Sequence, residues 1–430
     1  MPKVFACGTS WGDSSGKPSY FNKIFKDKNV AILESYNKGI GNFSKLKLGD
    51  LVAAKEGHKI IAIGKVNSEV KQFVTWHDYA NEYEAEKFGF SLDDEIHTVS
   101  IKDWYILDKY IEYQTQAGGC FINKENIINN IINTYNKEIY KMEKEEIINI
   151  LKNKKQIILQ GAPGTGKTYS SAEIAVKLID KNAPSEKAEL MKIYKELVNK
   201  KRIFFTTFHQ SMDYEEFVEG IKPKTINGNI AYELEDGIFK EACKSAENNK
   251  VVLIIDEINR GNISKIFGEL ITLLEVDKRK GKENEIEVIL PYSKEKFSVP
   301  DNLYIIGTIN TADRSIGNIY YDLRIRFDFI SIKADKSAIE NYYDNKNSDC
   351  KDKAINLFDE IKNLIDKNIN EEFEANDIMI GHSYFMAQNF EELQNKLEYE
   401  IKPLLLEYFK DGILKSNKDL KYTINNLNYE

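Results

Sequence analysis

Residues 161–168 read Gly-Ala-Pro-Gly-Thr-Gly-Lys-Thr, which fits the phosphate-binding pattern G-x-x-x-x-G-K-[ST]. In this pattern the glycines let backbone N–H groups close around a phosphate, and the following helix adds the partial positive charge of its N-terminus. The lysine reaches the β- and γ-phosphates, and the last hydroxyl is a ligand for Mg²⁺. The sequence therefore predicts a nucleoside triphosphate and magnesium site formed by Gly161, Ala162, Pro163, Gly164, Thr165, Gly166, Lys167 and Thr168.

Two carboxylates follow an apolar segment about ninety residues further on. Residues 251–255 are all Val, Leu or Ile, and Asp256 and Glu257 come directly after them. At the end of a core strand, Asp256 can hold Mg²⁺ through water, and Glu257 can polarise an attacking water. An acidic pair after a strand is often only a surface feature. Its position after a phosphate loop instead favours hydrolysis of the bound nucleotide.

A polar residue also ends the next apolar segment, since residues 303–306 lead through Gly307 and Thr308 to Asn310. An amide at this place can orient the attacking water or contact the γ-phosphate. The plainer alternative is an asparagine that only forms a turn. We expect Asn310 to act at the nucleotide.

Arginine is rare in this chain, because only six of its 60 Lys and Arg residues are Arg. Two of the six, Arg324 and Arg326, lie downstream of Asn310. A planar guanidinium suits the charge of a γ-phosphate better than an ammonium group does. We expect one or both to reach the nucleotide of a neighbouring subunit, while a structural salt bridge is the alternative for at least one of them.

The segments that must position these residues alternate between strand-like and helical patterns. The strand-like runs are residues 156–159, 203–207, 251–255 and 303–308. Such alternation is typical of an α/β domain with a parallel sheet and ligand sites at the C-terminal ends of its strands. No strand pattern remains after about residue 333. We predict a large α/β nucleotide-binding subdomain over 153–332 and a small all-helical lid over 333–430.

The first part of the chain has a different pattern. Residues 1–106 contain short β-like runs between turn formers, and their charges cancel, with 14 lysines against 14 acidic residues. They predict a small α+β module. Apolar residues at spacings of three and four then predict a helical linker over 107–152. That this helix belongs to the next domain is an equally supported interpretation.

Composition limits the class of protein. The chain has 430 residues, a formal charge of −8 and no apolar run long enough to cross a bilayer. Its four cysteines lie more than a hundred residues apart, which excludes metal-ligand spacing and a disulfide framework. We expect a soluble cytoplasmic protein that does not contact a membrane. The negative charge excludes a global basic field for nucleic acid, but it leaves a local binding face open.

The combined motifs resemble the McrB family, the AAA+ motor subunits of modified-DNA-specific restriction systems. Besides the phosphate loop, the resemblance rests on Phe-Thr-Thr-Phe-His-Gln-Ser at 205–211, Ile-Ile-Asp-Glu-Ile-Asn-Arg-Gly-Asn at 254–262, Ile-Asn-Thr-Ala-Asp-Arg-Ser at 309–315 and Ile-Gly-His-Ser-Tyr-Phe at 380–385. It covers about residues 145–430. It implies an AAA+ fold with a helical lid, GTP rather than ATP with Mg²⁺, a homo-hexameric ring, and a partner nuclease subunit of the McrC type that stimulates hydrolysis.

The resemblance also implies roles for single residues. Asn310 would position the water, Asp313 and Arg314 would shape the subunit interface, and Arg324 and Arg326 would be the arginine pair of the family. The family signature has Met where this chain has Ile309. This departure leaves ATP open as the nucleotide.

The N-terminal module resembles the PUA-superfamily readers of the EVE and YTH branches, through Gly-Asp-Leu-Val at 49–52 and the run 58–66. This resemblance implies that the module binds DNA with a modified base, which is flipped into an aromatic cage. Trp11, Trp76 and Trp104 each follow a strand-like run and are the candidate cage walls, because a base stacks on an aromatic ring. The alternative is that each tryptophan fills the core of a small module.

Two other functions stay open. One is an ATP-driven AAA+ remodelling protein whose N-terminal module binds a protein partner. The other is a binding protein whose nucleotide only switches its assembly, although Glu257 and Asn310 favour turnover. A nuclease within this chain is disfavoured, because no strand pattern for a further α/β domain follows the motor.

Overall fold

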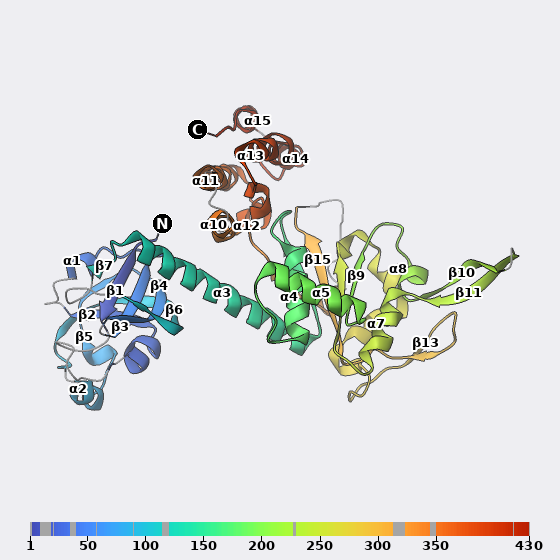
Figure 1. Cartoon of the computed structure of the whole chain (residues 1–430), viewed down its shortest axis with the longest axis horizontal. Helices are drawn as coiled ribbons and strands as arrows, with labels where there is room; N and C mark the ends of the chain where they lie inside the picture. The colour runs from blue at the N-terminus through green and yellow to red at the C-terminus, as the bar shows by residue number, and fades with distance from the viewer. Residues whose placement is uncertain are drawn as a thin grey trace. The chain divides into compact units, whose positions relative to one another are not determined.

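The computed structural model describes residues 2–8, 19, 21–34, 40–56, 58–88, 90–113, 120–226, 229–312, 323–344, 350–415 and 417–429. The chain forms two compact units, Met1–Glu143 and Lys144–Glu430, and each is described by itself (Figure 1). Among the described residues, no helix has both the length and the apolar character needed to cross a membrane.

The first unit is built on a mixed seven-stranded sheet. Its strands are β1 (Val4–Gly8), β2 (Val30–Glu34), β3 (Leu51–Glu56), β4 (Lys59–Val66), β5 (Lys71–Thr75), β6 (Glu95–Glu112) and β7 (Cys120–Phe121). The order is β2-β6-β4-β3-β1-β7, with β5 also paired to β6. β1 and β3 run parallel, and the other pairs are antiparallel. Short helices cover the sheet: η1 (Phe21–Lys26), α1 (Ile40–Phe43), η2 (Trp76–Asp78) and α2 (Glu82–Phe88).

This unit extends past residue 106, where the sequence pattern placed its end. Strand β6 continues to Glu112 because its second half pairs with β4, and β7 pairs with β1. Helix α3 (Glu125–Lys154) then takes up most of the predicted linker. Its residues Ile131 and Tyr135 pack in the core of the first unit, and Leu151 packs in the core of the second.

The second unit begins with a five-stranded parallel sheet, which confirms the predicted α/β fold. Its strands are β8 (Gln156–Gly161), β9 (Ile203–Thr207), β12 (Val251–Asp256), β15 (Leu303–Asn310) and β16 (Asp328–Ser331), in the order β16-β8-β15-β12-β9. The three central strands, β8, β15 and β12, are buried on both faces and are therefore mostly apolar. One face packs against α4 (Lys167–Ile179) and α5 (Lys187–Asn199).

The other face packs against α7 (Ile238–Ala246), α8 (Ile263–Phe267) and the 3-10 helix η4 (Gly268–Leu274). The remaining short helices on this side are α6 (Tyr214–Phe217), η3 (Ile258–Arg260) and η5 (Val276–Lys278). Two hairpins are added, β10 (Glu219–Ile226) with β11 (Asn229–Asp236) and β13 (Val288–Ile289) with β14 (Lys296–Phe297). In Figure 1 the β10–β11 ribbon projects from the body of this subdomain.

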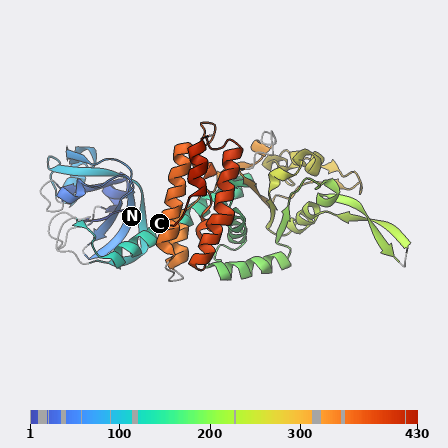
Figure 2. The ribbon, with the colours of Figure 1, turned by 90° about the horizontal axis from the view of Figure 1, so that it is seen from above.

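The described residues after β16 form only helices and one isolated bridge, which confirms the predicted lid. The helices are α10 (Lys336–Asp344), α11 (Lys351–Asn368), α12 (Ala375–Ile378), η6 (His382–Phe385), α13 (Phe390–Lys396), η7 (Leu397–Ile401), α14 (Lys402–Lys410) and α15 (Lys418–Asn425). They share one apolar core and pack as a bundle, seen from above in Figure 2.

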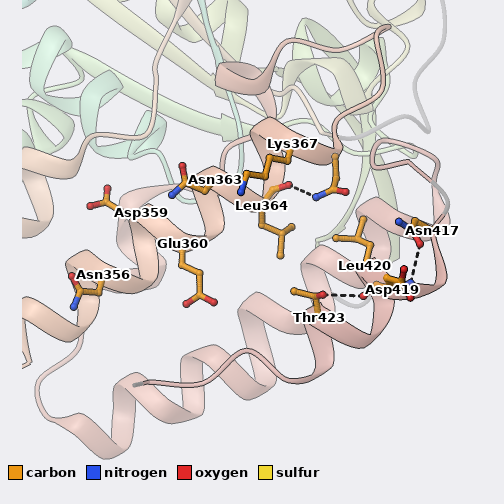
Figure 3. Close-up of a pocket in the computed structure, with 11 residues that line it drawn as sticks. Asn356, Asp359, Glu360, Asn363, Leu364, Lys367, Asn417, Asp419, Leu420 and Thr423 are labelled. Carbon is orange, nitrogen blue, oxygen red and sulfur yellow. Dashed lines mark hydrogen bonds between the residues drawn. The ribbon is translucent and has the colours of Figure 1, made fainter.

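An open groove of about 610 Å³ lies in the lid between α11 and α15 (Figure 3). Its walls are mostly amides and carboxylates, including Asn363 and Glu360 on α11 and Asp419 on α15. None of the residues of the sequence motifs lines it. The chemistry predicted from the motifs therefore has to be sought at the edge of the parallel sheet.

Arg279 is a fully buried cation at the opposite end of this sheet. Its guanidinium donates to the carbonyl oxygens of Leu274, Pro300 and Leu303 and to Oε1 of Gln156, at 2.5 to 3.2 Å. Burial lowers its pKa to about 10, so it stays charged at neutral pH. The side chain thus joins three parts of the chain, namely residues 274–279, residues 300–303 and the start of β8.

We expect Arg279→Met to lower the free energy of unfolding by about 3 kcal/mol or more, because buried acceptors lose their donors. Chemical denaturation followed by circular dichroism measures this change. Arg202→Met is the matched control, since the Arg202 side chain makes one hydrogen bond, to the Lys250 carbonyl oxygen, at the surface. A loss for Arg279→Met no larger than that for the control would contradict the assigned role.

Candidate nucleotide-binding and hydrolysis site

The phosphate loop leaves β8 at Gly161 and opens helix α4 at Lys167. Gly164 and Gly166 have φ of +77° and +83°, conformations that a side chain disfavours, which explains glycine at both positions. The Thr165 hydroxyl donates to the Ala162 carbonyl oxygen at 2.9 Å and braces the loop. The predicted loop residues thus form one continuous turn at the N-terminus of a helix.

Lys167 lies inside this loop. Its ammonium donates to the carbonyl oxygens of Gly161 and Ala162, both at 2.9 Å. Burial lowers its pKa to about 8, while the nearby Glu257 and Asp256 oppose that shift. A cation held in a desolvated loop is suited to bind an anion, because a phosphate supplies the missing opposite charge.

Asp256 ends β12, next to the strand that carries Asn310. Its Oδ1 accepts hydrogen bonds from the Thr308 hydroxyl at 2.6 Å and from the Thr168 hydroxyl at 3.4 Å. The Glu257 N–H donates to the same Thr308 oxygen at 3.1 Å. Thr308 therefore orients both acidic residues. Sequence reasoning assigned it no role, although a hydroxyl in an otherwise apolar strand was the available signal.

Oxygen ligands at one edge of the sheet suit a hard cation. The Thr168 hydroxyl and the Asp256 carboxylate lie within hydrogen-bonding distance of each other, beside the phosphate loop. Mg²⁺ prefers such oxygen donors together with phosphate and water. The two predicted metal ligands therefore fit the ion.

Glu257 is constrained in both its backbone and its side chain. Its backbone is left-handed at φ +52° and ψ +44°, which is costly for a residue with a side chain. Its Oε1 accepts a hydrogen bond from the Asn310 amide, and its Oε2 lies 3.3 Å from Nε of Arg260. The structure thus brings the side chains of Glu257 and Asn310 into contact. The contact with Arg260 was not foreseen, because it depends on the turn after Asp256.

The two downstream arginines differ in their surroundings. The Arg326 side chain is largely buried, its Nη2 lies 3.4 Å from Oε1 of Glu275, and its carbonyl accepts from Gln156. Arg324 is exposed, and its guanidinium lies 5.4 Å from the Phe329 ring centre. Arg326 therefore has the structural salt bridge that the sequence allowed for one of the pair. Asp313 and Arg314 lie outside the described residues.

A lid segment lies directly on the phosphate loop. The N–H groups of Gly381 and Ser383 donate to the carbonyl oxygens of Pro163 and Gly164, at 2.9 and 3.1 Å. A Cβ on Gly381 would stand 1.9 Å from the Gly164 carbonyl carbon, so only glycine fits. The Thr311 hydroxyl, next to Asn310, donates to the Asp377 carbonyl oxygen of the lid at 2.5 Å. Lid, loop and β15 are thus hydrogen-bonded to one another.

The tryptophans of the first unit lie in its core. Trp76 is fully buried and stacks on Phe90 with ring centres 4.1 Å apart. Trp104 is 9% exposed and packs against Phe21 and Phe25. To form a base cage, both would have to leave these contacts, since a cage wall must be open to its ligand. Trp11 lies outside the described residues.

Both parts of the second unit are similar to known protein domains. Residues 156–327 match the AAA domain of the dynein-related subfamily, and residues 355–417 match the McrB alpha-helical lid domain. The chain is 38% identical over 291 residues to the type IV methyl-directed restriction enzyme EcoKMcrB subunit of Escherichia coli (strain K12), which covers 64% of this chain and 58% of that subunit.

A second relative is the type II restriction enzyme BsuMI component YdiS of Bacillus subtilis (strain 168). It is 25% identical over 297 residues, which covers 62% of this chain and 81% of that protein. The chain therefore spans somewhat more than half the length of the E. coli relative and most of the B. subtilis one.

Proposed function

We propose that the protein is a GTP-hydrolysing motor subunit of a modification-dependent restriction system, because its helical lid matches the McrB lid domain and the chain is 38% identical to the E. coli McrB subunit over 291 residues. The proposal includes recognition of modified DNA by the first unit and a separate nuclease subunit of the McrC type. The observation that carries it is the meeting of Lys167, Asp256, Glu257 and Asn310 at one edge of the sheet, under a McrB-type lid.

Different residues of the site bind the phosphates, hold the metal ion and activate the attacking water. Lys167 and the loop N–H groups bind the β- and γ-phosphates, and Thr168 and Asp256 hold magnesium, which neutralises charge on the phosphate oxygens when bound. Glu257 accepts a proton from the attacking water. Asn310 orients that water, because its amide already contacts the Glu257 carboxylate. The water oxygen bonds to the γ-phosphorus as the bond to the bridging oxygen breaks, so inorganic phosphate and a nucleoside diphosphate are the products.

Glu257 must be freed before it can act on water. Both of its carboxylate oxygens face a donor, Asn310 on one side and Arg260 on the other. With both oxygens engaged, water can reach the carboxylate only after one of these donors moves away. The Arg260 side chain is half exposed, so a partner that binds at this surface can compete with Glu257 for it. This arrangement supports a motor whose basal turnover is slow and whose partner stimulates it.

The residue that departs from the family signature lies in the core. Ile309 is 1% exposed and packs among the apolar residues between β15 and the helices beside it. Ile in place of Met therefore exchanges one buried apolar side chain for another of similar volume. This placement supports retention of the guanine preference implied by the family resemblance.

Arg324 has no carboxylate partner among the described residues, and this supports a role for it across a subunit boundary in a ring. Arg324 is exposed, whereas Arg326 is held by Glu275 in its own subunit. We therefore assign the role in trans to Arg324, in a homo-hexameric ring with nucleotide at each interface. Arg326 then supports the turn that presents Arg324, since the Gln156 side chain fixes its carbonyl.

DNA recognition is assigned to the first unit. Residues 1–106 carry 14 lysines and 14 acidic residues, so phosphate attraction alone cannot give tight binding, and most of the affinity must come from a pocket for the base. Trp11 remains the leading candidate for a stacking wall, because Trp76 and Trp104 pack in the core. The names of both relatives, a restriction enzyme subunit and a restriction enzyme component, support a nuclease partner.

We expect the full chain to bind one modified duplex at least about tenfold more tightly than its unmodified counterpart, because a stacked base contributes about 1–3 kcal/mol. Duplexes with N6-methyladenine, 5-methylcytosine or N4-methylcytosine, and the same duplex without a mark, test this by fluorescence anisotropy. Trp11→Ala should abolish the preference. Trp76→Phe, which keeps a ring against Phe90, should bind as the wild type does.

The dependence on salt gives a second test of the same claim. Binding should weaken only slightly between low and physiological salt, because few phosphates are neutralised. Equal affinity for all four duplexes would contradict base reading and would favour a protein partner for this unit. An unchanged preference in a folded Trp11→Ala variant would exclude that residue from the pocket.

A further inference from the structure

His382 lies between the two backbone hydrogen bonds that join the lid to the phosphate loop. Gly381 and Ser383, its neighbours on either side, bond to Pro163 and Gly164. Its Nε2 lies 3.5 Å from the position that a Cβ on Gly166 would occupy. Gly166 is the N-cap of helix α4. The imidazole therefore stands beside the N-terminus of that helix, where an anion is favoured.

The hydrogen bond made by Nδ1 of His382 shows which ring nitrogen carries the proton. The Asp335 N–H donates to Nδ1 of His382 at 3.3 Å, so Nδ1 must be an acceptor. Burial lowers the pKa of His382, although the Asp335 carboxylate opposes the shift. The ring is therefore neutral at pH 7 and carries its proton on Nε2. Among the described residues, no hydrogen bond is made by Nε2.

Gly166 leaves the space between the ring and the loop open. The positive φ of this residue requires glycine, and the missing side chain keeps Nε2 accessible from the loop. A donor N–H, a helix N-terminus and an adjacent Lys167 together form a site for phosphate oxygen, because hydrogen bonds to a charged acceptor are stronger than neutral ones.

We propose that Nε2–H of His382 donates a hydrogen bond to a phosphate oxygen of the nucleotide in the loop, so that the lid senses the phosphates directly. This rests on the proposed function, which places a nucleotide there. His382 is then a binding residue contributed by the lid. Because the Thr311 hydroxyl bonds to Asp377, the same lid also contacts the residue that follows Asn310. The phosphate contact would therefore add to the protein hydrogen bonds that already hold the lid on the loop.

Two substitutions separate the proposed donor from the structural acceptor. His382→Asn places an amide oxygen where Nδ1 accepts from Asp335, but it has no donor at the Nε2 position. His382→Gln places an amide N–H at the Nε2 position, but it loses the acceptor at Nδ1. A purely structural histidine needs the acceptor, whereas a phosphate-binding one needs the donor.

The test measures the affinity of each full-length variant for guanosine and adenosine diphosphates and for their non-hydrolysable triphosphate analogues, together with the thermal midpoint of the nucleotide-free protein. We expect His382→Asn to bind about tenfold more weakly than the wild type, and His382→Gln within about threefold of it. The thermal midpoint should change in the opposite order. Lys167→Ala serves as the control that abolishes binding through the loop.

Wild-type affinity in His382→Asn, or an equal loss in both variants, would overturn the proposal, because the histidine would then act only through the lid backbone. A preference for adenine nucleotides in the wild type would contradict the proposed GTP specificity while the comparison between variants still holds. Wild-type protein that binds neither nucleotide would overturn both proposals.

Discussion

Glu257→Gln is expected to lower the turnover of nucleotide by about three orders of magnitude or more while the affinity for nucleotide changes by less than about threefold. The amide keeps the shape of the side chain but cannot accept a proton from water. The phosphates are bound elsewhere, by Lys167 and the loop. Steady-state hydrolysis and equilibrium binding to a non-hydrolysable analogue separate the two effects.

Glu196→Gln provides the control for this substitution, because Glu196 is an exposed residue of α5 paired only loosely with Lys200 at 3.8 Å. It should hydrolyse at the wild-type rate. Hydrolysis by Glu257→Gln at a rate near that of the wild type would show that another group activates the water. A loss of binding with the loss of turnover would mean that Glu257 supports the loop and not the chemistry.

Arg324→Ala is expected to lower turnover by about three orders of magnitude with little effect on stability, since a guanidinium that stabilises transferring phosphate contributes about 10³-fold or more. Arg326→Ala should instead lower the free energy of unfolding, because it removes a largely buried guanidinium and its ion pair with Glu275. Hydrolysis assays should therefore show the larger loss for Arg324→Ala, and chemical denaturation should show the larger loss for Arg326→Ala. Similar losses of turnover with unchanged stability would contradict the division of roles.

Mixing variants tests whether Arg324 acts on a neighbour. Subunits with Glu257→Gln still offer Arg324, and subunits with Arg324→Ala still have Glu257. In rings of equal proportions about a quarter of the sites combine both intact groups, so about a quarter of the wild-type rate should return. If both variants assemble but mixing restores nothing, Arg324 acts within its own subunit or not at all.

The parts of the site that the sequence predicted are those set by local rules. A phosphate loop needs glycines at the positive φ positions 164 and 166, and it needs a strand before it and a helix after it. Each requirement is visible in a short window. The alternation of strand and helix patterns then predicts that β8, β12 and β15 run parallel. Parallel strands bring Asp256 and Asn310 to the same edge as Gly161.

The features that the sequence did not predict depend on contacts between distant segments. Nothing near Trp76 indicates that Phe90 covers it, and nothing near Arg326 indicates the salt bridge with Glu275. Thr308 gains its role only because β15 lies beside β12. The end of the first unit was placed too early for the same reason, since pairing with β4 extends β6 to Glu112.

The central claim is that this chain hydrolyses GTP with Mg²⁺ at the site formed by Lys167, Asp256, Glu257 and Asn310. The most direct measurement is phosphate release by the purified chain from GTP and from ATP, with and without Mg²⁺ and a modified duplex. We predict Mg²⁺-dependent hydrolysis of GTP that exceeds that of ATP by at least about tenfold. Hydrolysis of ATP without hydrolysis of GTP would contradict the account and would favour an ATP-driven remodelling protein.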